Sequence, residues 1–403
     1  MQVLWKHHAK YLGLGLAALA ASALVACGGG GSGSADAGQG SLRLAMTDAP
    51  ACGYDHVYVT VERVRVHQSS SASDNDSGWS EVALATPKRL DLLSLTNGVL
   101  EELGQTQLPA GNYTQVRLVL TDNTGNNQLA NAVQPTGGAL VALSTPSAQQ
   151  SGLKLKTNFQ VQSGQTADLL LDFDACRSVV LAGNSGNYIL KPVMSVTPRV
   201  ASGIQGYVST TLTLNGTLVT AQQSGVVVRS TVPDATGKFV LPSLAAGNYD
   251  LVVTSDGHST AVVPSVPVTA TASTSINGTA TAILPPVATM RTISGTASVG
   301  TTGTSTTLVT DATVRATQAL TGGPTVEVVS LPVNATSAAY QLRVPADAPV
   351  KAAFTAGSAP AFSADTAAAG KYKVEASATG RTTVQQGADV GTADQTVNLM
   401  FAP

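Results

Sequence analysis

The stretch His56-Val57-Tyr58-Val59-Thr60-Val61-Glu62-Arg63-Val64-Arg65-Val66-His67 decides the fold. Valine occupies every second position from Val57 to Val61, and again at Val64 and Val66, which is the two-residue period of a β-strand with one apolar face. The apolar parity changes between Val61 and Val64. A β-bulge at that point would keep both halves of the strand facing one core. The stretch therefore predicts one long, bulged strand.

Further strands are predicted on both sides of this stretch, because several short segments alternate or are rich in β-branched residues. They are residues 42–46, 79–84, 89–95, 114–120, 153–161, 167–173 and 188–196. None of them shows a sustained 3.6-residue period. Residues 92–103 are the one place in this region where a short helix is predicted. The fold class is therefore all-β, as tandem β-sandwiches.

The composition agrees with an all-β chain outside the cytoplasm. Of 403 residues, 39 are Gly, 19 are Pro and only 11% are charged, against roughly 25% charged residues in an ordinary globular domain. A length of about 375 residues after removal of a leader suggests three domains, at residues 41–200, 201–288 and 289–403. The remaining chain carries 20 basic and 24 acidic residues. It lacks the basic excess that a nucleic-acid partner requires.

The first 26 residues have the build of a secretory signal peptide. Lys6 and Lys10 precede an apolar run over residues 12–25, which ends in small residues. A permanent transmembrane helix is the alternative. The uncharged run is shorter than the roughly 18–20 residues that cross a bilayer, and the four glycines that follow it do not continue a helix cheaply.

The end of this leader, Leu24-Val25-Ala26-Cys27, resembles the lipobox of bacterial lipoproteins. The resemblance implies that the thiol of Cys27 carries a diacylglycerol and that its amine is acylated after cleavage, with chains such as palmitate. Several acyl chains on one residue anchor a protein durably. Gly28 in place of an aspartate favours the outer membrane, with the periplasmic face and the cell surface both left open. Residues 27–40 are then the lipidated cysteine and a flexible Gly/Ser tether, and an ordinary secreted protein is the alternative.

The first domain carries six features in a fixed order. They are Thr47-Asp48-Ala49-Pro50, the valine-alternating strand that ends at His67, Leu108-Pro109-Ala110-Gly111-Asn112-Tyr113, Gly152-Leu153-Lys154-Leu155, Asp172-Phe173-Asp174 and Leu190-Lys191-Pro192-Val193. Together they resemble a bacterial lipoprotein domain family of unknown function that covers residues 41–200. The resemblance implies no catalytic role for any residue.

The second domain resembles the carboxypeptidase regulatory-like domain, a prealbumin-like β-sandwich. The motifs that carry the resemblance are Ile204-Gln205-Gly206-Tyr207-Val208, Asp234-Ala235-Thr236-Gly237-Lys238-Phe239-Val240-Leu241 and Ala245-Ala246-Gly247-Asn248-Tyr249-Asp250-Leu251. Asp-x-x-Gly is a tight turn whose glycine tolerates positive φ, and the glycine before tyrosine is expected to do the same at the next strand. The third segment repeats this order of strands and turns, with about 30 additional residues. A tyrosine at a strand entry recurs in each domain, so Tyr113, Tyr249 and Tyr372 are predicted to pack on three cores.

Cysteine counting predicts one disulfide. With Cys27 committed to lipid, Cys52 and Cys176 remain as a pair in a compartment that permits disulfides. Closing a loop of about 125 residues contributes roughly 4–5 kcal/mol in the chain-entropy model. Two unpaired, buried thiols are the alternative.

The disulfide would bring Asp48 close to the strand end that carries Asp172 and Asp174. Two residues apart on one strand face, these two lie roughly 6–7 Å from each other. The three carboxylates could then bind Ca²⁺. The alternative is that they are surface or turn-capping residues paired with Arg177 or Lys191. No other cofactor is expected.

The sequence contains none of the common catalytic motifs after the leader. Its three remaining histidines are His56, His67 and His258, and the first two lie at opposite ends of one predicted strand. We therefore expect a non-enzymatic binding or scaffold lipoprotein, with an envelope protein or a glycan as partner. A carbohydrate-binding protein is the alternative, which one patch of Tyr54, Tyr58 and Trp79 would favour. A surface hydrolase is the second alternative, which a cleft with a histidine beside an acid and a serine would favour.

Overall fold

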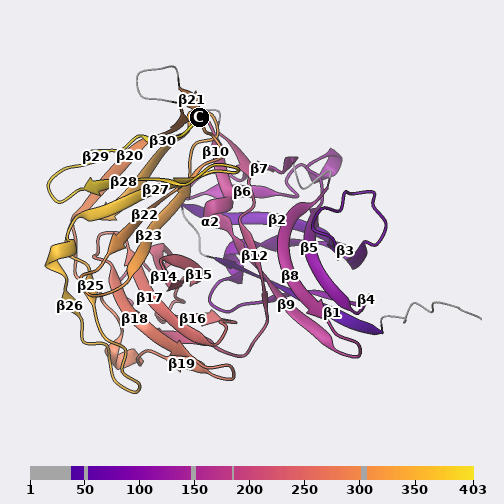
Figure 1. Cartoon of the computed structure of the whole chain (residues 1–403), viewed down its shortest axis with the longest axis horizontal. Helices are drawn as coiled ribbons and strands as arrows, with labels where there is room; N and C mark the ends of the chain where they lie inside the picture. The colour runs from indigo at the N-terminus through magenta and orange to yellow at the C-terminus, as the bar shows by residue number, and fades with distance from the viewer. Residues whose placement is uncertain (1–37, 50–52, 147–150, 184–185, 301–305) are drawn as a thin grey trace, which may run out of the picture. The chain divides into compact units, whose positions relative to one another are not determined.

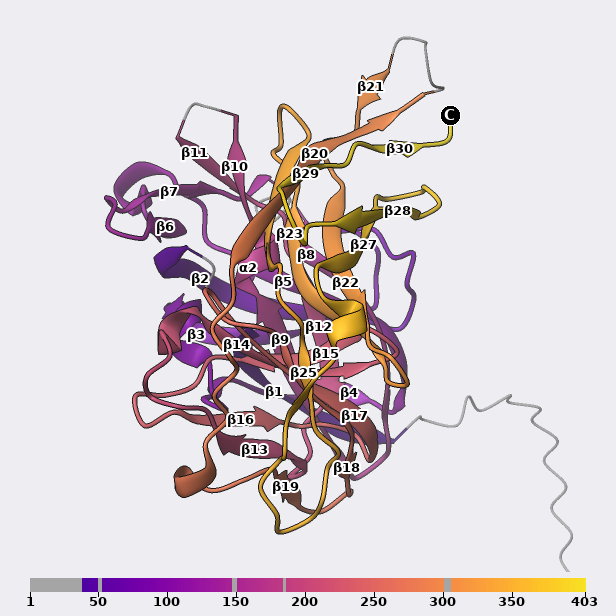
Figure 2. The same cartoon turned by 90° about the vertical axis from the view of Figure 1, so that its left-hand side faces the viewer.

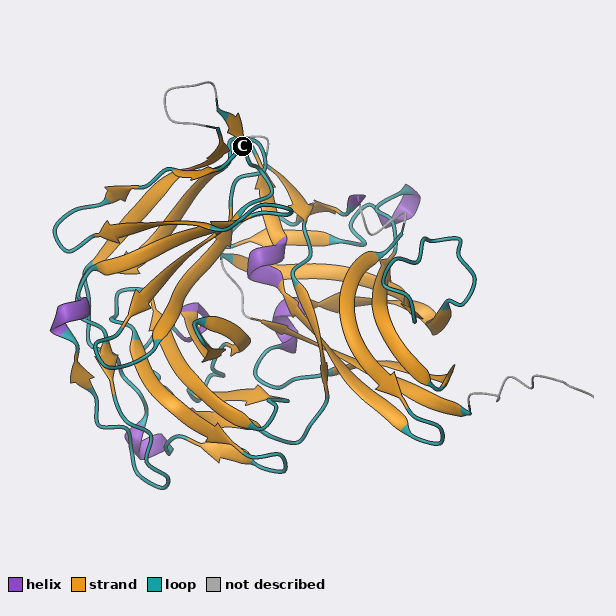
Figure 3. Ribbon diagram, viewed as in Figure 1, coloured by secondary structure: helices purple, strands orange, loops and turns teal. Residues whose placement is uncertain are grey.

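The computed structural model describes residues 38–49, 53–146, 151–183, 186–300 and 306–403, which form six sheets (Figures 1 and 3). The sheets pack around three apolar cores. The chain is therefore an all-β protein of tandem β-sandwiches, as predicted. Within the described residues, no helix has the length and apolar character needed to span a membrane.

The first sandwich pairs a four-stranded sheet with an eight-stranded one. The smaller sheet has the order β12 (Met194–Pro198), β9 (Thr166–Asp174), β1 (Gln39–Ala49) and β4 (Glu101–Pro109). The larger has the order β10 (Val179–Ala182), β11 (Asn187–Leu190), β7 (Val141–Ser144), β6 (Ala132–Pro135), β2 (Tyr54–His67), β5 (Gly111–Leu120) and β8 (Leu153–Val161), with β3 (Ser80–Asp91) paired to β2. The short helices η1 (Leu92–Leu95), η2 (Gly125–Asn127) and α2 (Ala175–Ser178) lie in connections between strands.

Strand β2 confirms the bulge that the valine pattern predicts. Its pairing register with both β3 and β5 shifts between Val61 and Arg63. The valines on the two sides of this bulge are all fully buried in the first core. The extra residue turns the second half of the strand so that Val64 and Val66 face the same way as Val57 and Val61.

The helix predicted over residues 92–103 is wrong. Only the single turn η1 forms, and its first residues are capped because the Asp91 carboxylate accepts a hydrogen bond from the Leu93 backbone N–H. Asn97 and Gly98 then take φ angles of 56° and 81°. Two successive residues in the left-handed region cannot continue a right-handed helix, so the chain turns and enters β4.

The second sandwich pairs a three-stranded sheet with a six-stranded one. The smaller sheet has the order β16 (Lys238–Pro242), β13 (Gly203–Tyr207) and β19 (Ser273–Ser275). The larger has the order β15 (Val226–Thr231), β14 (Thr217–Gln223), β17 (Gly247–Ser255), β18 (Ala261–Val268), β25 (Val350–Lys351) and β26 (Ser363–Ala364), and η3 (Leu214–Gly216) and η4 (Thr279–Thr281) lie outside the sheets. The predicted turn glycine, Gly237, has φ +78° and no room for a Cβ, which would lie 2.2 Å from the Val208 carbonyl oxygen.

Strands β25 and β26 come from the third segment of the sequence but complete the sheet of the second sandwich. Both are labelled near β18 in Figure 1, and β25 is also labelled in Figure 2. We call residues 346–365 the clasp. Val350 is buried in the second core, and Phe354 and Phe362 pack against it. The Val350 N–H also donates a hydrogen bond to the Thr260 carbonyl oxygen at 2.8 Å. The clasp accounts for most of the additional length of the third segment.

The third sandwich pairs a five-stranded sheet with a four-stranded one. In the first, β20 (Met290–Val299) pairs with β21 (Thr307–Leu308), β24 (Ala339–Pro345), β29 (Gln395–Thr396) and β30 (Leu399–Phe401). The second has the order β23 (Thr325–Pro332), β22 (Thr313–Ala319), β27 (Lys371–Ser377) and β28 (Val384–Asp389), and η5 (Thr366–Ala368) precedes β27.

The three tyrosines at strand entries are buried in the three cores, as predicted. The hydroxyls of Tyr113 and Tyr249 each donate to a carbonyl four residues earlier, at 3.0 and 2.9 Å. The hydroxyl of Tyr372 donates instead to Pro345 at 2.6 Å. The positive φ expected for the preceding glycine occurs only at Gly370, with +65°, and is wrong for Gly247. The tyrosine, more than the glycine, is therefore what the three strand entries share.

Side-chain amides join neighbouring sandwiches by binding the backbone of an edge strand. The amide of Gln222, on β14, donates to the Glu327 carbonyl oxygen on β23 and accepts from the Glu327 N–H, both at 2.8 Å. Asn97 of the first sandwich binds β16 in the same way, through the Lys238 carbonyl oxygen at 3.2 Å and the Val240 N–H at 2.7 Å. Each amide takes the place that a further strand would occupy.

We predict that Gln222→Ala destabilises the protein by about 1–3 kcal/mol, because it leaves both backbone groups of a half-buried Glu327 without their partner. Urea unfolding followed by circular dichroism measures the change. The neighbouring Gln223→Ala is the matched control, since Gln223 is exposed, and its effect should stay within about 0.5 kcal/mol. Equal effects of the two substitutions would contradict the role assigned to Gln222.

Candidate functional site

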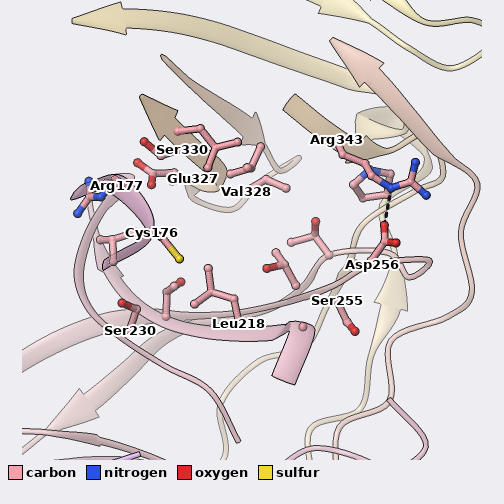
Figure 4. Close-up of a pocket in the computed structure, with 18 of the residues that line it drawn as sticks. Cys176, Arg177, Leu218, Ser230, Ser255, Asp256, Glu327, Val328, Ser330 and Arg343 are labelled. Atoms are coloured by element: carbon pink, nitrogen blue, oxygen red, sulfur yellow. Dashed lines mark hydrogen bonds and ion pairs between the residues drawn. The ribbon is translucent and has the colours of Figure 1, made fainter. Parts of the chain in front are cut away.

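A cavity of about 680 Å³ lies where the three sandwiches meet (Figure 4). The first sandwich contributes α2 to its lining, including Cys176 and Arg177. The second contributes β14, β15 and β17, and the third contributes β23 and β24. The volume is in the range of about 300–1,000 Å³ that is typical of small-molecule and peptide sites. We treat this cavity as the candidate functional site.

Strand alternation explains the wall that the second sandwich contributes. On β14 and β17, Val219 and Val253 face the core of the second sandwich. Leu218, Thr220 and Thr254 therefore point to the opposite face of the sheet, where they line the cavity. This face combines apolar groups with hydroxyls.

The opposite wall comes from β23 and β24, and the two strands line it differently. On β24, Gln341, Arg343 and Pro345 line the cavity, whereas the residues between them are buried in the third core. On β23, five consecutive residues from Glu327 to Leu331 line it. Strand β24 thus presents one face to the cavity, and β23 presents both faces and the edge between them.

Charged groups gather at the end of the cavity formed by α2. The Asp174 carboxylate caps α2 and pairs with the Nε of Arg177 at 2.6 Å. Burial acts to lower the pKa of Arg177, but the charges of Asp174, Glu327 and Asp172 outweigh it and raise the pKa. Burial raises the pKa of Glu327, although Arg177 and Arg315 act against this shift. Arg315 lies 3.3 Å from the Glu327 carboxylate.

The other end of the cavity holds Ser255, Asp256 and His258, the residue types that a hydrolase would need. Their side chains are bound to other groups and not to one another. The Asp256 carboxylate pairs with the Nε of Arg343 at 2.6 Å, and the Ser255 hydroxyl accepts from Thr217 at 2.9 Å. The Nδ1 of His258 lies 3.1 Å from the Asp256 backbone carbonyl oxygen. Serine, histidine and acid thus share a cavity here without forming a relay.

The three predicted calcium ligands have other partners. The Asp48 carboxylate accepts from the Ala175 N–H at 3.1 Å, and Asp174 pairs with Arg177 as the alternative interpretation expected. Asp172 pairs with Arg229 of β15 at 2.6 Å. Within the described part of the chain, no three His, Cys, Asp or Glu side chains are grouped so that they could hold a metal ion.

Asp172 and Arg229 form the junction between the first two sandwiches. Leu171 and Phe173 face the first core, as predicted, but the other face of β9 is also buried, because Leu170 has no exposed surface. The Asp172 side chain is 12% exposed and that of Arg229 is 1% exposed. Burial raises the pKa of Asp172 to about 6, although the charge of Arg229 acts against this shift.

The aromatic side chains do not form the single patch that sugar binding would favour. Tyr54 packs edge-on against Tyr188, with ring centroids 6.1 Å apart. Tyr58 stacks on His56 and lies beneath Arg89. Trp79 contacts His67 at the far end of β2 and lies between two guanidinium groups. The rings are therefore distributed to both ends of β2.

His56 pairs with Asp91 at 2.6 Å. The Ser94 hydroxyl nearby donates to the Asp91 backbone carbonyl oxygen at 2.6 Å. Among the described residues, no hydroxyl is bound to the His56 ring, which stacks on Tyr58.

Two sequence predictions fall on residues outside the described ranges. Cys27 lies there, and so does Cys52, so the acylation and the Cys52–Cys176 disulfide stay predictions. Cys176 itself is in α2, 9% exposed, and lines the cavity.

Two families match parts of the chain. Residues 39–192 match the domain of unknown function DUF4382, and residues 203–281 match the carboxypeptidase regulatory-like domain. The first match falls on the first sandwich, and the second match falls on the second sandwich. A search of curated proteins finds no match.

Several solved structures align weakly with the chain. A type II cohesin–X-dockerin complex from Acetivibrio cellulolyticus aligns with 22% of the chain and 58% of its own, at 24% identity and a TM-score of 0.18. The Bacillus anthracis TIE protein aligns with 91% of the chain and 51% of its own, at 13% identity and 0.19. The Corynebacterium diphtheriae major pilin SpaA aligns with 90% of the chain and 100% of its own, at 12% identity and 0.18. The chain thus spans little more than half of the first two structures.

The raised pKa of Asp172 predicts a pH-dependent stability. Because the folded-state pKa lies above the ordinary value of 3.8, the folded protein holds this proton more tightly than the unfolded chain. The stabilisation that the protonated Asp172 provides is full below pH 3.8 and is lost as the pH rises through about 6. The stability of the wild type relative to Asp172→Asn should therefore fall by roughly 2 kcal/mol between pH 4 and pH 7.

Urea unfolding of both proteins across this pH range measures the difference. Asp122→Asn, at an exposed aspartate, is the control and should show no comparable trend. A relative stability that rises with pH would contradict the assignment to Asp172.

The predicted disulfide is tested by alkylation and intact-mass measurement. We expect Cys52 and Cys176 to resist iodoacetamide in the unfolded, unreduced protein and to take up two labels after reduction. Reduction should also lower the melting temperature, since it opens a loop of about 125 residues. Labelling of either thiol before reduction would disprove the bond.

Proposed function

We propose that this protein is a membrane-anchored lipoprotein of the bacterial envelope, outside the cytoplasm, that acts as a binding or scaffold protein without catalysing a reaction. The resemblance of Leu24-Val25-Ala26-Cys27 to a lipobox supports the anchor. The Gly/Ser-rich residues that follow would tether the first sandwich to the membrane.

The observation that carries the binding role is the cavity between the sandwiches. Its walls come from three domains that are joined by buried polar contacts, such as Gln222 with Glu327 and Asp172 with Arg229. Buried polar groups require their partners, so these contacts favour one arrangement of the domains. A ligand site built from several rigid domains suits recognition.

The side chains around the cavity support binding over catalysis. At each end of the cavity, an acid is paired with an arginine. At the end opposite α2, the serine and the histidine are hydrogen-bonded to other groups and not to each other's side chains. A nucleophile without a positioned base gains little reactivity. The lack of an aromatic patch on β2 also favours a protein partner over a glycan.

The anchor is tested by metabolic labelling with tritiated palmitate in a Gram-negative host that expresses the full chain. We expect the wild type to carry the label and to fractionate with the outer membrane. Cys27→Ser should lose the label and keep its leader. Cys176→Ser is the matched control and should keep the label, because only Cys27 stands at the end of the leader. Unlabelled wild-type protein that retains residues 1–26 would refute the proposal.

A further inference from the structure

Strand β23 has an edge without a partner strand beside the cavity. It is the last strand of its sheet, because among the described residues it pairs only with β22. At Glu327 this edge is occupied by the amide of Gln222. Beyond Glu327 the strand continues along the cavity as far as Leu331. An unpaired edge in a concave site is where an extended peptide can add as a further strand.

The two sandwiches approach most closely at the beginning of β23 and separate along it. The turn between β14 and β15 contains Gly225, and a Cβ added there would lie 3.0 Å from the Thr325 carbonyl oxygen. The Gly225 carbonyl oxygen also accepts a hydrogen bond from Arg315 at 2.9 Å. One end of the space beside β23 is therefore closed, and the cavity occupies the part that remains.

Hydroxyl side chains also line the cavity. Thr254 on β17 and Ser330 on β23 are among the lining residues, and both are half-buried. A ligand with amide groups can exchange hydrogen bonds with such hydroxyls.

The lining selects among ligand classes. Its apolar residues are aliphatic, including Leu218, Val227 and Leu331, and among the described lining residues there is no Trp, Tyr or Phe. A sugar would lack the ring platform on which it usually stacks. An alkyl chain would leave the hydroxyls unpaired. A peptide with aliphatic side chains satisfies both the apolar walls and the hydroxyls.

The charges of the lining set a further condition. Three acids, Asp174, Asp256 and Glu327, face two arginines, Arg177 and Arg343. A slight excess of negative charge disfavours an acidic ligand.

We infer that this cavity binds an extended peptide segment with alternating aliphatic side chains and no acidic residues, which adds as a strand to the free edge of β23. This inference rests on the proposed binding function and names its ligand. Backbone hydrogen bonds to β23 supply affinity, and the aliphatic lining around Leu218 and Leu331 receives alternate side chains.

The probe is a fluorescein-labelled pool of hexapeptides that alternate Val, Ile or Leu with Thr, Ser or Lys. Fluorescence anisotropy with the chain from Gly28 to Pro403 should show saturable binding. A matched pool with proline at every second position should not bind, because proline cannot donate to a strand ladder. A pool with Glu in place of Lys should bind more weakly.

Two substitutions that fill the cavity locate the site. Ser330→Trp and Thr254→Phe should each raise the Kd at least about tenfold. Ser358→Trp is the control, since Ser358 is exposed and lies outside the lining, and it should leave the Kd unchanged. Circular dichroism confirms that each variant is folded, and the two cavity variants are read independently.

The inference is overturned if the alternating pool with Lys does not bind, if the proline pool or the Glu pool binds equally well, or if the cavity variants bind like the wild type. Displacement of the peptides by palmitate or maltohexaose, with those ligands binding more tightly, would also overturn it. None of these results bears on palmitate labelling at Cys27, so failure of this inference is distinguishable from failure of the proposed anchor.

Discussion

The pairing of the Gln222 amide with both backbone groups of Glu327 is the contact on which the arrangement of the second and third sandwiches depends. A strand edge offers alternating donors and acceptors that water satisfies only while the edge is exposed. When two sandwiches meet, the buried part of such an edge must find other partners. A glutamine or asparagine supplies one donor and one acceptor from a single side chain. Asn97 meets the same requirement at β16.

The part of the β23 edge beyond Glu327 lies beside the cavity. The contact between Gln222 and Glu327, which joins the two domains, therefore also determines where the site begins. Charged pairs follow the same principle. Arg229 reaches from β15 to Asp172, and its charge offsets part of the cost of burying that carboxylate. Domain packing and site formation are thus consequences of one need, the pairing of buried polar groups.

Local pattern predicts most of the elements within each sandwich. The valines of β2 indicated the strand, its buried face and its bulge, because alternation is a property of neighbouring residues. The helix over residues 92–103 failed because two left-handed residues, Asn97 and Gly98, interrupt it. Asp174 was expected beside Arg177 and lies there, since the two are three residues apart.

The cavity could not be predicted in this way, because it depends on contacts across about 100 residues of sequence, as between Gln222 and Glu327. Arg229 offered a signal, a lone charge in a valine-rich strand. The clasp offered none, because β25 and β26 are two residues each and show no periodicity.

The clasp has a consequence for biosynthesis. Strand β18 receives its neighbour β25 from a part of the chain that is made more than 80 residues later. During synthesis, the second sandwich forms while one edge of β18 still has no neighbouring strand, and its sheet is complete only after residues 346–365 have been made. A product truncated before these residues would expose that edge permanently and could pair with other chains there.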